Sequence, residues 1–370
     1  MSHWCYRVLL AAAVIFPAAG ALGQIIPYHG PSYTRNELAP GVWAFVFDNG
    51  LGDRALVDGT ALVIINDADV VVVDAQGTPT TARRVLAEIR KLTPKPVRYV
   101  ITTHWHGDHW LGNQVYQEAF PGVEFIAHPN NLEDLEALEL PGLDSARNVT
   151  MPRTLKDMEQ GYAKSVRRDG KSYSPQDSVL TAGQIAAFRW AIPAMKEIRP
   201  VKPTLLVADS LTLRRGERTI VVRFLGRGNT RGDLSVWLPK ERILATGDLL
   251  VNPAPYSFGS FLREWVQTLT KLHQLPAAVI VPGHGAIQRD WAYVDLFVEL
   301  LNSTLGQAKD AVAKGLDLEA TRKAVDLTAF RERFAGGDDL KGLAFDAFFV
   351  APAVERAWLE ARGELDKAPR

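Results

Sequence analysis

Cysteine is almost absent from this 370-residue chain, because Cys5 is the only one. Cys5 lies in an N-terminal segment that we expect to be removed, so the mature chain would have neither a disulfide nor a thiolate metal ligand. Surplus charge is missing as well, since 42 Lys and Arg residues balance 42 Asp and Glu residues. This balance gives no electrostatic case for binding nucleic acid or an anionic membrane surface. After the N-terminal segment, no apolar run is long enough to cross a bilayer.

The first 23 residues are typical of a secretory signal peptide. A basic residue precedes the apolar run 8–16, and the small residues 21–23 (Ala-Leu-Gly) fit a cleavage site. The run is short for a membrane span, and Pro17 favours cleavage over the alternative of an uncleaved anchor. We therefore expect a mature chain that begins near Gln24, is periplasmic or secreted, and is not attached to a membrane.

Four residues with metal-binding side chains lie within six positions: His104, His106, Asp108 and His109. The β-branched run 97–101 before them is typical of a strand, so we expect them in the tight loop that follows it. The first two histidines alternate along an extended chain and point the same way, and Gly107 allows a turn before the last two residues. An ordinary polar loop is the alternative, but the whole chain has only 8 histidines. Neutral imidazoles and carboxylates are ligands that suit zinc.

This loop resembles the His-x-His-x-Asp-His signature of the metallo-β-lactamase superfamily, and further landmarks of that family follow over about residues 40–290. Asp248 matches the aspartate that bridges two metals in the glyoxalase-like and lactonase-like branches, where the best-known β-lactamase subclasses have Cys or Ser. His284, in a Pro-Gly-His-Gly loop, matches the last ligand of the second metal. Asp74, after the apolar run 70–73, would support the metal loop without binding the metal, unless it is a helix cap or a turn residue.

The resemblance implies two metal sites that share one carboxylate. One site would be formed by Asp108, His109, Asp248 and His284, which make a complete tetrahedral set. The other would be formed by His104 and His106, with Asp248 as the bridging ligand.

One position departs from the family pattern. The family loop Gly-x-Gly-His-Thr-x-Gly-Asp corresponds to residues 226–233, where Asn229 replaces the histidine that is the third ligand of the first metal. An amide oxygen is a weaker zinc ligand than an imidazole. We therefore expect Asn229 to be a weak ligand or to form a hydrogen bond with substrate or water. The first site would then bind zinc weakly, so that one or two zinc ions are held.

Short apolar runs and amphipathic stretches alternate through the chain, which favours a layered α/β fold. The resemblance implies an αββα sandwich of four layers over residues 36–290. We expect a helical insertion at about 131–203, in which Pro141 and Gly142 separate two helices. Residues 291–370 would form a C-terminal helical extension, with one helix over 343–359, that packs on the core or makes a homodimer contact.

A metal-activated water is a nucleophile near neutral pH, so we expect hydrolysis of an ester, lactone or amide bond, including the β-lactam amide, in a small molecule. Asp108 would orient or deprotonate the attacking water. Tyr256 would reach the substrate, or pack as an ordinary loop aromatic. Arg227 and Arg231 would hold a substrate carboxylate, or remain solvated at the surface. Apolar surroundings would come from Trp105, Trp110, Phe258 and Phe261.

Two other functions fit the same fold. One is a sulfur or thioester redox enzyme with a single iron, and the other is a metal-binding protein that lost hydrolase activity when Asn229 replaced a ligand. Metal analysis distinguishes the iron redox enzyme from a zinc hydrolase. Turnover of chromogenic substrates distinguishes the metal-binding protein from a hydrolase.

Overall fold

The computed structural model describes residues 28–48, 58–167 and 170–367. The expected signal peptide, its cleavage site and Cys5 lie outside these residues. Within them, no helix combines the length and the apolar character that a bilayer span requires.

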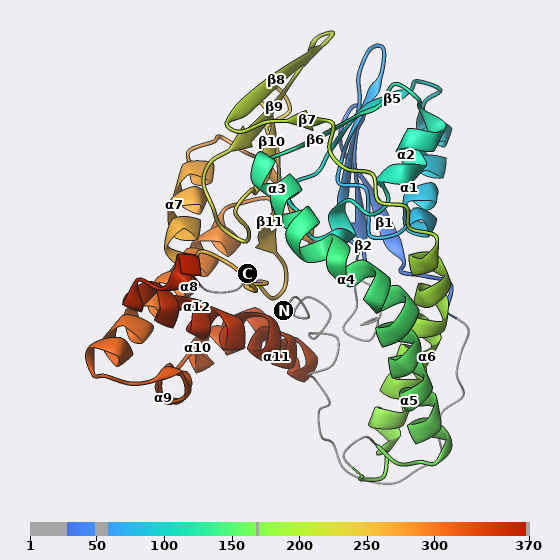
Figure 1. Cartoon of the computed structure of the whole chain (residues 1–370). Coiled ribbons are helices and arrows are strands. Elements are labelled where there is room, and N and C mark those ends of the chain that lie inside the picture. Colours follow the sequence, from blue (N-terminus) through green and yellow to red (C-terminus); the bar gives the residue numbers. More distant parts are fainter. Residues whose placement is uncertain (1–27, 49–57, 168–169, 368–370) are drawn as a thin grey trace.

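Two β-sheets form the centre of the protein (Figure 1). The first sheet has seven strands in chain order, antiparallel from β1 to β4 and parallel from β4 to β7. Its strands are β1 (Tyr33–Ala39), β2 (Val42–Phe47), β3 (Ala61–Ile65), β4 (Val70–Val73), β5 (Val97–Ile101), β6 (Glu124–Ala127) and β7 (Leu205–Leu206). The second sheet has the order β12-β11-β10-β9-β8, and only its β11 and β12 are parallel. Its strands are β8 (Ser210–Arg215), β9 (Arg218–Phe224), β10 (Leu234–Leu238), β11 (Ile243–Val251) and β12 (Val279–His284).

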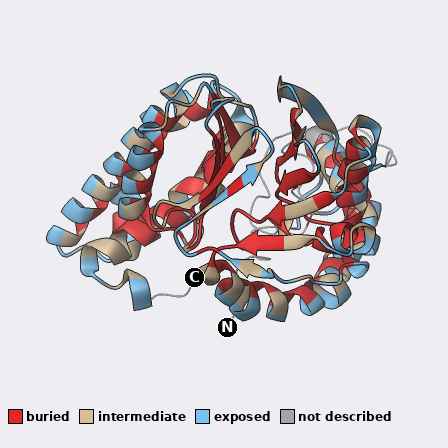
Figure 2. Ribbon diagram, turned by 90° about the horizontal axis from the view of Figure 1, so that it is seen from above, coloured by how far each residue is buried: buried red, intermediate tan, exposed pale blue. Residues whose placement is uncertain are grey.

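The sheets pack face to face and are covered by helices on their outer faces (Figure 2). Val71 and Ile101 of the first sheet share one apolar core with Val236 and Val281 of the second. Helices α1 (Pro79–Leu92) and α2 (Asn113–Ala119) cover the first sheet, and α7 (Leu262–His273) and α8 (Ala292–Ala313) cover the second. The near-continuous β-branched runs are explained by this arrangement, because each sheet is buried on both faces. The αββα sandwich predicted from the sequence is confirmed.

A helical segment connects β6 to β7 and runs along one side of the molecule (Figure 1). It consists of α3 (Pro129–Asp134), η3 (Leu135–Glu139), α4 (Leu140–Ser145), η4 (Ala146–Thr150), α5 (Met151–Ala163) and α6 (Pro175–Lys196). The break expected at Pro141 and Gly142 is wrong, because the chain stays helical through them. Pro141 lies in the first turn of α4, after the wider π-helical turn η3, where its missing N–H is tolerated.

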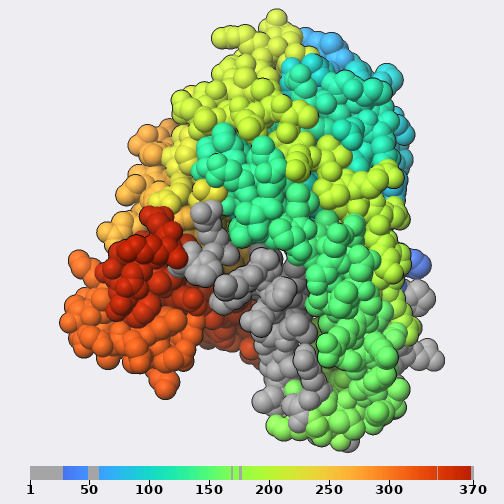
Figure 3. Space-filling view, viewed as in Figure 1, coloured from blue at the N-terminus to red at the C-terminus, as the bar shows by residue number. Residues whose placement is uncertain are grey.

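The C-terminal extension packs its helices on α7 and α8. After α8 come α9 (Leu318–Ala324), α10 (Thr328–Ala335), α11 (Asp339–Phe345), η5 (Asp346–Val350), α12 (Ala351–Arg362) and η6 (Leu365–Lys367). Residues 343–359 are helical as expected, with the π-helical turn η5 between α11 and α12. Figure 3 shows the insertion in green and this extension in orange and red as two projections from the sandwich.

Candidate metal centre

The predicted ligand loop lies where β4 and β5 of the first sheet meet β11 and β12 of the second. Asp74 follows β4 directly, and the loop follows β5. Because β4 and β5 are parallel, both segments emerge at the same edge of the sheet. The backbone N–H of Leu234 donates to the carbonyl of Thr103 at 2.8 Å and ties the second sheet to this loop. Inside the loop, the Trp110 indole N–H donates to the Trp105 carbonyl at 2.8 Å.

Four side chains from the two halves of the sandwich converge on one point. Oδ2 of Asp108 lies 3.0 Å from Nε2 of His284 and 3.3 Å from Nε2 of His109. The two histidine Nε2 atoms are 3.2 Å apart. Oδ1 of Asp248 lies 3.4 Å from each of these nitrogens. The ligand atoms of Asp108, His109 and His284 all lie within 4.8 Å of one another, and Asp248 adjoins this group through the two histidine nitrogens.

A second group of donor atoms adjoins the first and shares Asp248. Nε2 of His104 lies 3.5 Å from Oδ2 of Asp248, the oxygen that does not face His284. Nδ1 of His106 lies 2.9 Å from the same His104 nitrogen. The Asp248 carboxylate thus lies between the two groups, with one oxygen directed to each.

Asp74 holds the ligand loop in position. Its Oδ1 accepts a hydrogen bond from the Thr103 backbone N–H at 2.8 Å, and its Oδ2 accepts one from the Thr103 hydroxyl at 2.8 Å. The same Oδ2 lies 2.8 Å from Nδ1 of His109. This contact leaves the other ring nitrogen of His109, Nε2, directed at the four-residue cluster. Thr103 is a site residue that the sequence analysis missed, and its only signal is its place directly before the first histidine.

Two glycines make room for the carboxylates around the site. A Cβ atom at residue 283 would lie 2.0 Å from Oδ1 of Asp248, so only glycine lets this carboxylate approach the turn before His284. A Cβ atom at Gly107 would lie 2.6 Å from a carboxylate oxygen of Glu139. Glu139 belongs to η3, so the helical insertion contacts the ligand loop at this glycine.

Burial and neighbouring charges strongly shift the pKa values of side chains at this centre. Burial and the His104 ring lower the pKa of His106 to about 3, which keeps its imidazole neutral. Burial alone would raise the pKa of Asp108, but the adjacent His109 outweighs it and holds that pKa well below its usual range. Three carboxylates surround the ring of His109, with Asp74 at Nδ1 and Asp108 and Asp248 at Nε2. So many close carboxylates favour binding of a cation.

The spacing of the donor atoms fits a metal ion. Metal bonds of about 2.0–2.1 Å at tetrahedral angles separate ligand atoms by about 3.3 Å. The distances that join His109 and His284 to each other and to the Asp108 and Asp248 oxygens run from 3.0 to 3.4 Å. Oδ1 of Asp248 is also buried without a hydrogen-bond partner among the described residues. The residues present therefore fit a divalent metal in the four-residue cluster.

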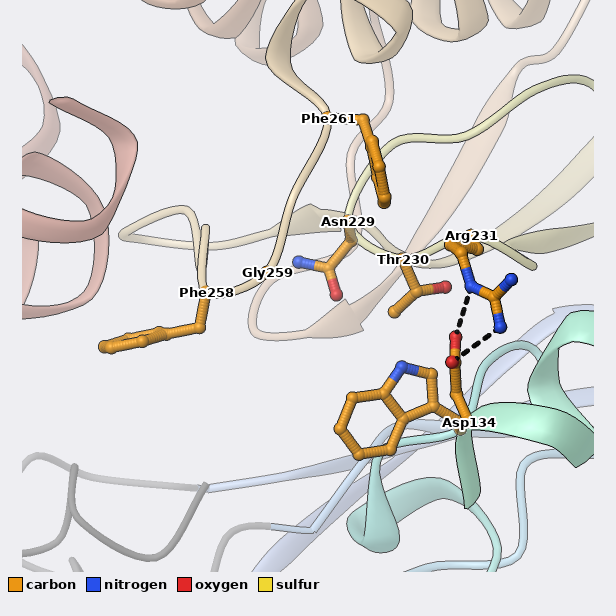
Figure 4. Close-up of a pocket in the computed structure, with 8 residues that line it drawn as sticks. Asp134, Asn229, Thr230, Arg231, Phe258, Gly259 and Phe261 are labelled. Carbon is orange, nitrogen blue, oxygen red and sulfur yellow. Dashed lines mark hydrogen bonds and ion pairs between the residues drawn. The ribbon is translucent and has the colours of Figure 1, made fainter. Parts of the chain in front are cut away.

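Asn229 is fully buried beside this centre, and Figure 4 shows it at the edge of a small pocket. Its amide nitrogen donates to the Tyr256 carbonyl at 2.6 Å, and the Tyr256 ring lies 5.5 Å from the His106 ring. We call this the Asn229 pocket. It is lined by Trp105, Phe258 and Phe261 as its apolar part, and by Asp134, Asn229, Thr230, Arg231 and Gly259.

Both candidate arginines bind carboxylates of the chain itself. Arg227 pairs with Glu264 and Asp366 and stacks over Phe261, with its guanidinium carbon 4.1 Å from the ring centre. Arg231 pairs with Asp134 through Nε and Nη2 (Figure 4) and also with Glu133. These contacts do not support the expectation that either arginine holds a substrate carboxylate.

Residues 54–284 match the family model described as the metallo-beta-lactamase superfamily. The range includes both donor groups and well over half of the chain. The chain belongs to the metallo-β-lactamase superfamily. The resemblance stated from the ligand loop is therefore confirmed at the level of the family.

Curated relatives are similar to this member of the superfamily over part of their length. The linear primary-alkylsulfatase of Pseudomonas sp. is 25% identical over 230 residues, which are 58% of this chain and 39% of that protein. The metallo-beta-lactamase IND-1 of Chryseobacterium indologenes is 31% identical over 108 residues, which are 27% of this chain and 44% of that protein. The chain thus spans less than half the length of these relatives.

Solved structures of the superfamily align with most of the chain at low sequence identity. The metallo-beta-lactamase from Pontibacter korlensis is 18% identical, with a TM-score of 0.48 and coverage of 73% of this chain and 99% of that one. The DIM-1 metallo-beta-lactamase is 19% identical, with a TM-score of 0.49 and coverage of 74% and 98%.

Proposed function

We propose that this protein is a zinc-dependent hydrolase of an ester, lactone or amide bond in a small molecule. The observation that carries the proposal is the convergence of His109 and His284 on each other and on the carboxylates of Asp108 and Asp248, at separations of 3.0 to 3.4 Å. The names of the two relatives, an alkylsulfatase and a metallo-β-lactamase, denote hydrolases and support the reaction class.

Imidazole nitrogens and carboxylate oxygens, without a thiolate, are a donor set that zinc accepts in hydrolytic sites. The four-residue cluster would hold the tighter ion, and His104, His106 and Asp248 would hold a weaker one because the third histidine is absent. A bound zinc supplies two kinds of chemistry, polarising a substrate oxygen and lowering the pKa of water.

Asp108 is the residue best placed to orient the attacking water or to take its proton. Its side chain is 22% exposed, whereas those of Asp74 and Asp248 are 2% and 5% exposed. Asp108 is therefore the carboxylate of the site that solvent reaches most easily. The contacts to His109 and His284 fix its Oδ2 and hold the carboxylate in one orientation.

The charges around the Asn229 pocket favour a neutral substrate. Arg231 is the one cation among its described lining residues, and the Asp134 carboxylate neutralises it. Arg227, behind the Phe261 ring, is neutralised by Glu264. An anionic group in this pocket would lose its hydration without gaining an unpaired cation. We therefore expect neutral esters and lactones to be better substrates than β-lactams or alkyl sulfates.

Metal analysis combined with a substrate panel tests this function. Purified protein should contain zinc, and it should hydrolyse neutral chromogenic esters faster than a chromogenic cephalosporin or an aryl sulfate. His284→Ala should lose metal and turnover together. Iron as the sole metal would favour the redox alternative. Zinc-loaded protein that turns over no member of the panel would indicate a metal-binding protein without hydrolase activity.

A further inference from the structure

The side-chain amide of Asn229 has a hydrogen-bonded nitrogen and an oxygen without a hydrogen-bond partner among the described residues. The side chain is fully buried, its amide nitrogen donates to the Tyr256 carbonyl at 2.6 Å, and its oxygen has no partner among the described residues. Buried polar atoms without a partner are rare in folded proteins, and each one requires an explanation.

The orientation of this amide is fixed by its surroundings. A carbonyl oxygen only accepts hydrogen bonds, so the group that faces Tyr256 has to be the NH₂ and not the oxygen. The backbone on either side is also held, because the Thr230 N–H and hydroxyl both donate to Asp233 at 2.8 Å. The Gly228 carbonyl accepts the Phe261 N–H at 2.9 Å. The Asn229 oxygen therefore keeps one direction.

That direction is into the Asn229 pocket. Figure 4 shows the nitrogen turned toward the segment at Gly259 and the oxygen turned into the space that Phe258 and Asp134 border. Asn113 provides a contrast elsewhere in the chain. Its nitrogen donates to the Val201 carbonyl at 3.1 Å and its oxygen is likewise buried without a partner, but Asn113 does not line the pocket. Among the described residues, Asn229 is the one whose amide oxygen is buried without a partner and also lines this pocket.

We propose that the Asn229 oxygen accepts a hydrogen bond from an uncharged N–H or O–H group of the substrate, which is seated in the Asn229 pocket. The proposal rests on the proposed hydrolase function and identifies the substrate class as neutral esters or lactones with such a donor near the scissile bond. The free volume of the pocket is about 10 Å³, which is room for a group the size of one water molecule, so the donor itself enters it and Trp105, Phe258 and Phe261 form the apolar wall around that donor. The charge of Arg231 is already paired with Asp134, which favours an uncharged ligand over an anion.

A donor on the substrate suits this oxygen better than a metal ion does. First-row metals bind imidazole and carboxylate in preference to a neutral amide, and Asp248 already lies between the two donor groups. The amide oxygen has no hydrogen bond to His104 or to His106. Nε2 of His104 and Nδ1 of His106 instead lie 2.9 Å from each other. The oxygen is thus open to a donor that enters the pocket.

Matched substrates test the proposal. We would compare p-nitrophenyl esters whose acyl chain carries a secondary amide with the same esters N-methylated, and hydroxyl-bearing esters with their methyl ethers. Natural protein should favour the donor-bearing member of at least one pair by about tenfold in kcat/KM. In Asn229→Leu, this preference should fall to about one while the zinc content stays unchanged. Asn113→Leu, which also loses a buried amide, should keep the preference of the natural protein.

Binding of compounds that cannot be hydrolysed tests the recognition role of Asn229 separately from the hydrolase function. Ketones that replace the ester oxygen by a methylene group are not hydrolysed, and calorimetry gives their affinity for the zinc-loaded protein. Donor-bearing ketones should bind about tenfold more tightly to natural protein than to Asn229→Leu. If no ester is hydrolysed but this difference remains, the hydrolase function fails and the recognition role holds.

Two results would overturn the recognition role. One is that natural protein does not prefer the donor-bearing esters and ketones over their methylated counterparts, or that Asn229→Leu keeps the same preference as natural protein. The other is the loss of a zinc equivalent in Asn229→Leu, which would make Asn229 a metal ligand.

Discussion

Ser257 is fastened to the carbonyl of Phe348 by two hydrogen bonds, one from its backbone N–H at 3.0 Å and one from its hydroxyl at 3.3 Å. The hydroxyl also lies 3.1 Å from the Phe349 carbonyl. Both carbonyls belong to the π-helical turn η5, whose register leaves carbonyl groups available to side chains. Ser257 adjoins Tyr256, whose carbonyl orients Asn229. The C-terminal extension therefore forms part of the support of the site.

Arg356 strengthens this attachment and offers a first prediction. From α12 it donates to the carbonyl oxygens of Ser260 at 2.7 Å and Gly259 at 3.2 Å. Arg356→Met keeps the length of the side chain but removes both donors, so the free energy of unfolding should fall by about 2–4 kcal/mol. KM for donor-bearing esters should rise more than kcat falls, because Gly259 lines the pocket.

Urea denaturation and steady-state kinetics measure these two effects, and Arg356→Lys should recover part of both. Arg322→Met is the matched control, because Arg322 pairs with Glu319 and Glu355 at the surface and its loss should cost less than about 0.5 kcal/mol. Unchanged KM in Arg356→Met would show that the extension does not position the loop.

Asp74→Asn should weaken zinc binding by about 10- to 100-fold without unfolding the protein. The backbone of Asp74 is left-handed, with φ 62°, a conformation that asparagine tolerates better than most residues. The change keeps the shape of the side chain but removes the charge that faces Nδ1 of His109. Competition with a chromophoric chelator gives the affinity, and circular dichroism checks the fold. Zinc affinity equal to that of natural protein would refute the supporting role of Asp74.

Zinc titration of metal-free protein should show one tight equivalent, from the four-residue cluster, and a second one that is clearly weaker. In Asn229→His, the imidazole completes the group around His104 and His106, so two tight equivalents are expected. Calorimetry measures both stoichiometry and affinity. Two equally tight sites in natural protein, unchanged in Asn229→His, would contradict a weakened first site.

The exported protein should begin near Gln24. N-terminal sequencing or intact-mass measurement of periplasmic or secreted material decides this. Mature protein that retains Met1 to Gly23 would contradict the signal-peptide interpretation.

Local sequence patterns predicted a layered α/β fold and the ligand loop because both depend on neighbouring residues, whereas the αββα sandwich was implied by the family resemblance. The β-branched strands and the cluster from His104 to His109 carry their signal within a few positions. β1 was not predicted because its sequence, YTRNELA, is mostly polar and forms an edge strand. β7 was not predicted because it has only two residues.

Partners far apart in the chain could not be predicted in this way. The pairing of Arg231 with Asp134 joins residues 97 positions apart, and that of Arg227 with Asp366 joins residues 139 positions apart. The orientation of Asn229 depends on a backbone carbonyl 27 residues later, a group that every residue type provides. Such contacts are decided by tertiary packing, which the local pattern does not contain.

The ligands of the four-residue cluster come from both sheets, since Asp108 and His109 follow β5 whereas Asp248 and His284 belong to β11 and β12. An ion held by all four acts as a cross-link between the halves of a sandwich whose described residues contain no cysteine. Binding at a free zinc concentration of 100 times the Kd adds about 2.7 kcal/mol to the stability of the folded state. The melting temperature of this protein should therefore follow the zinc supply, much as that of a disulfide-bonded protein follows the redox potential.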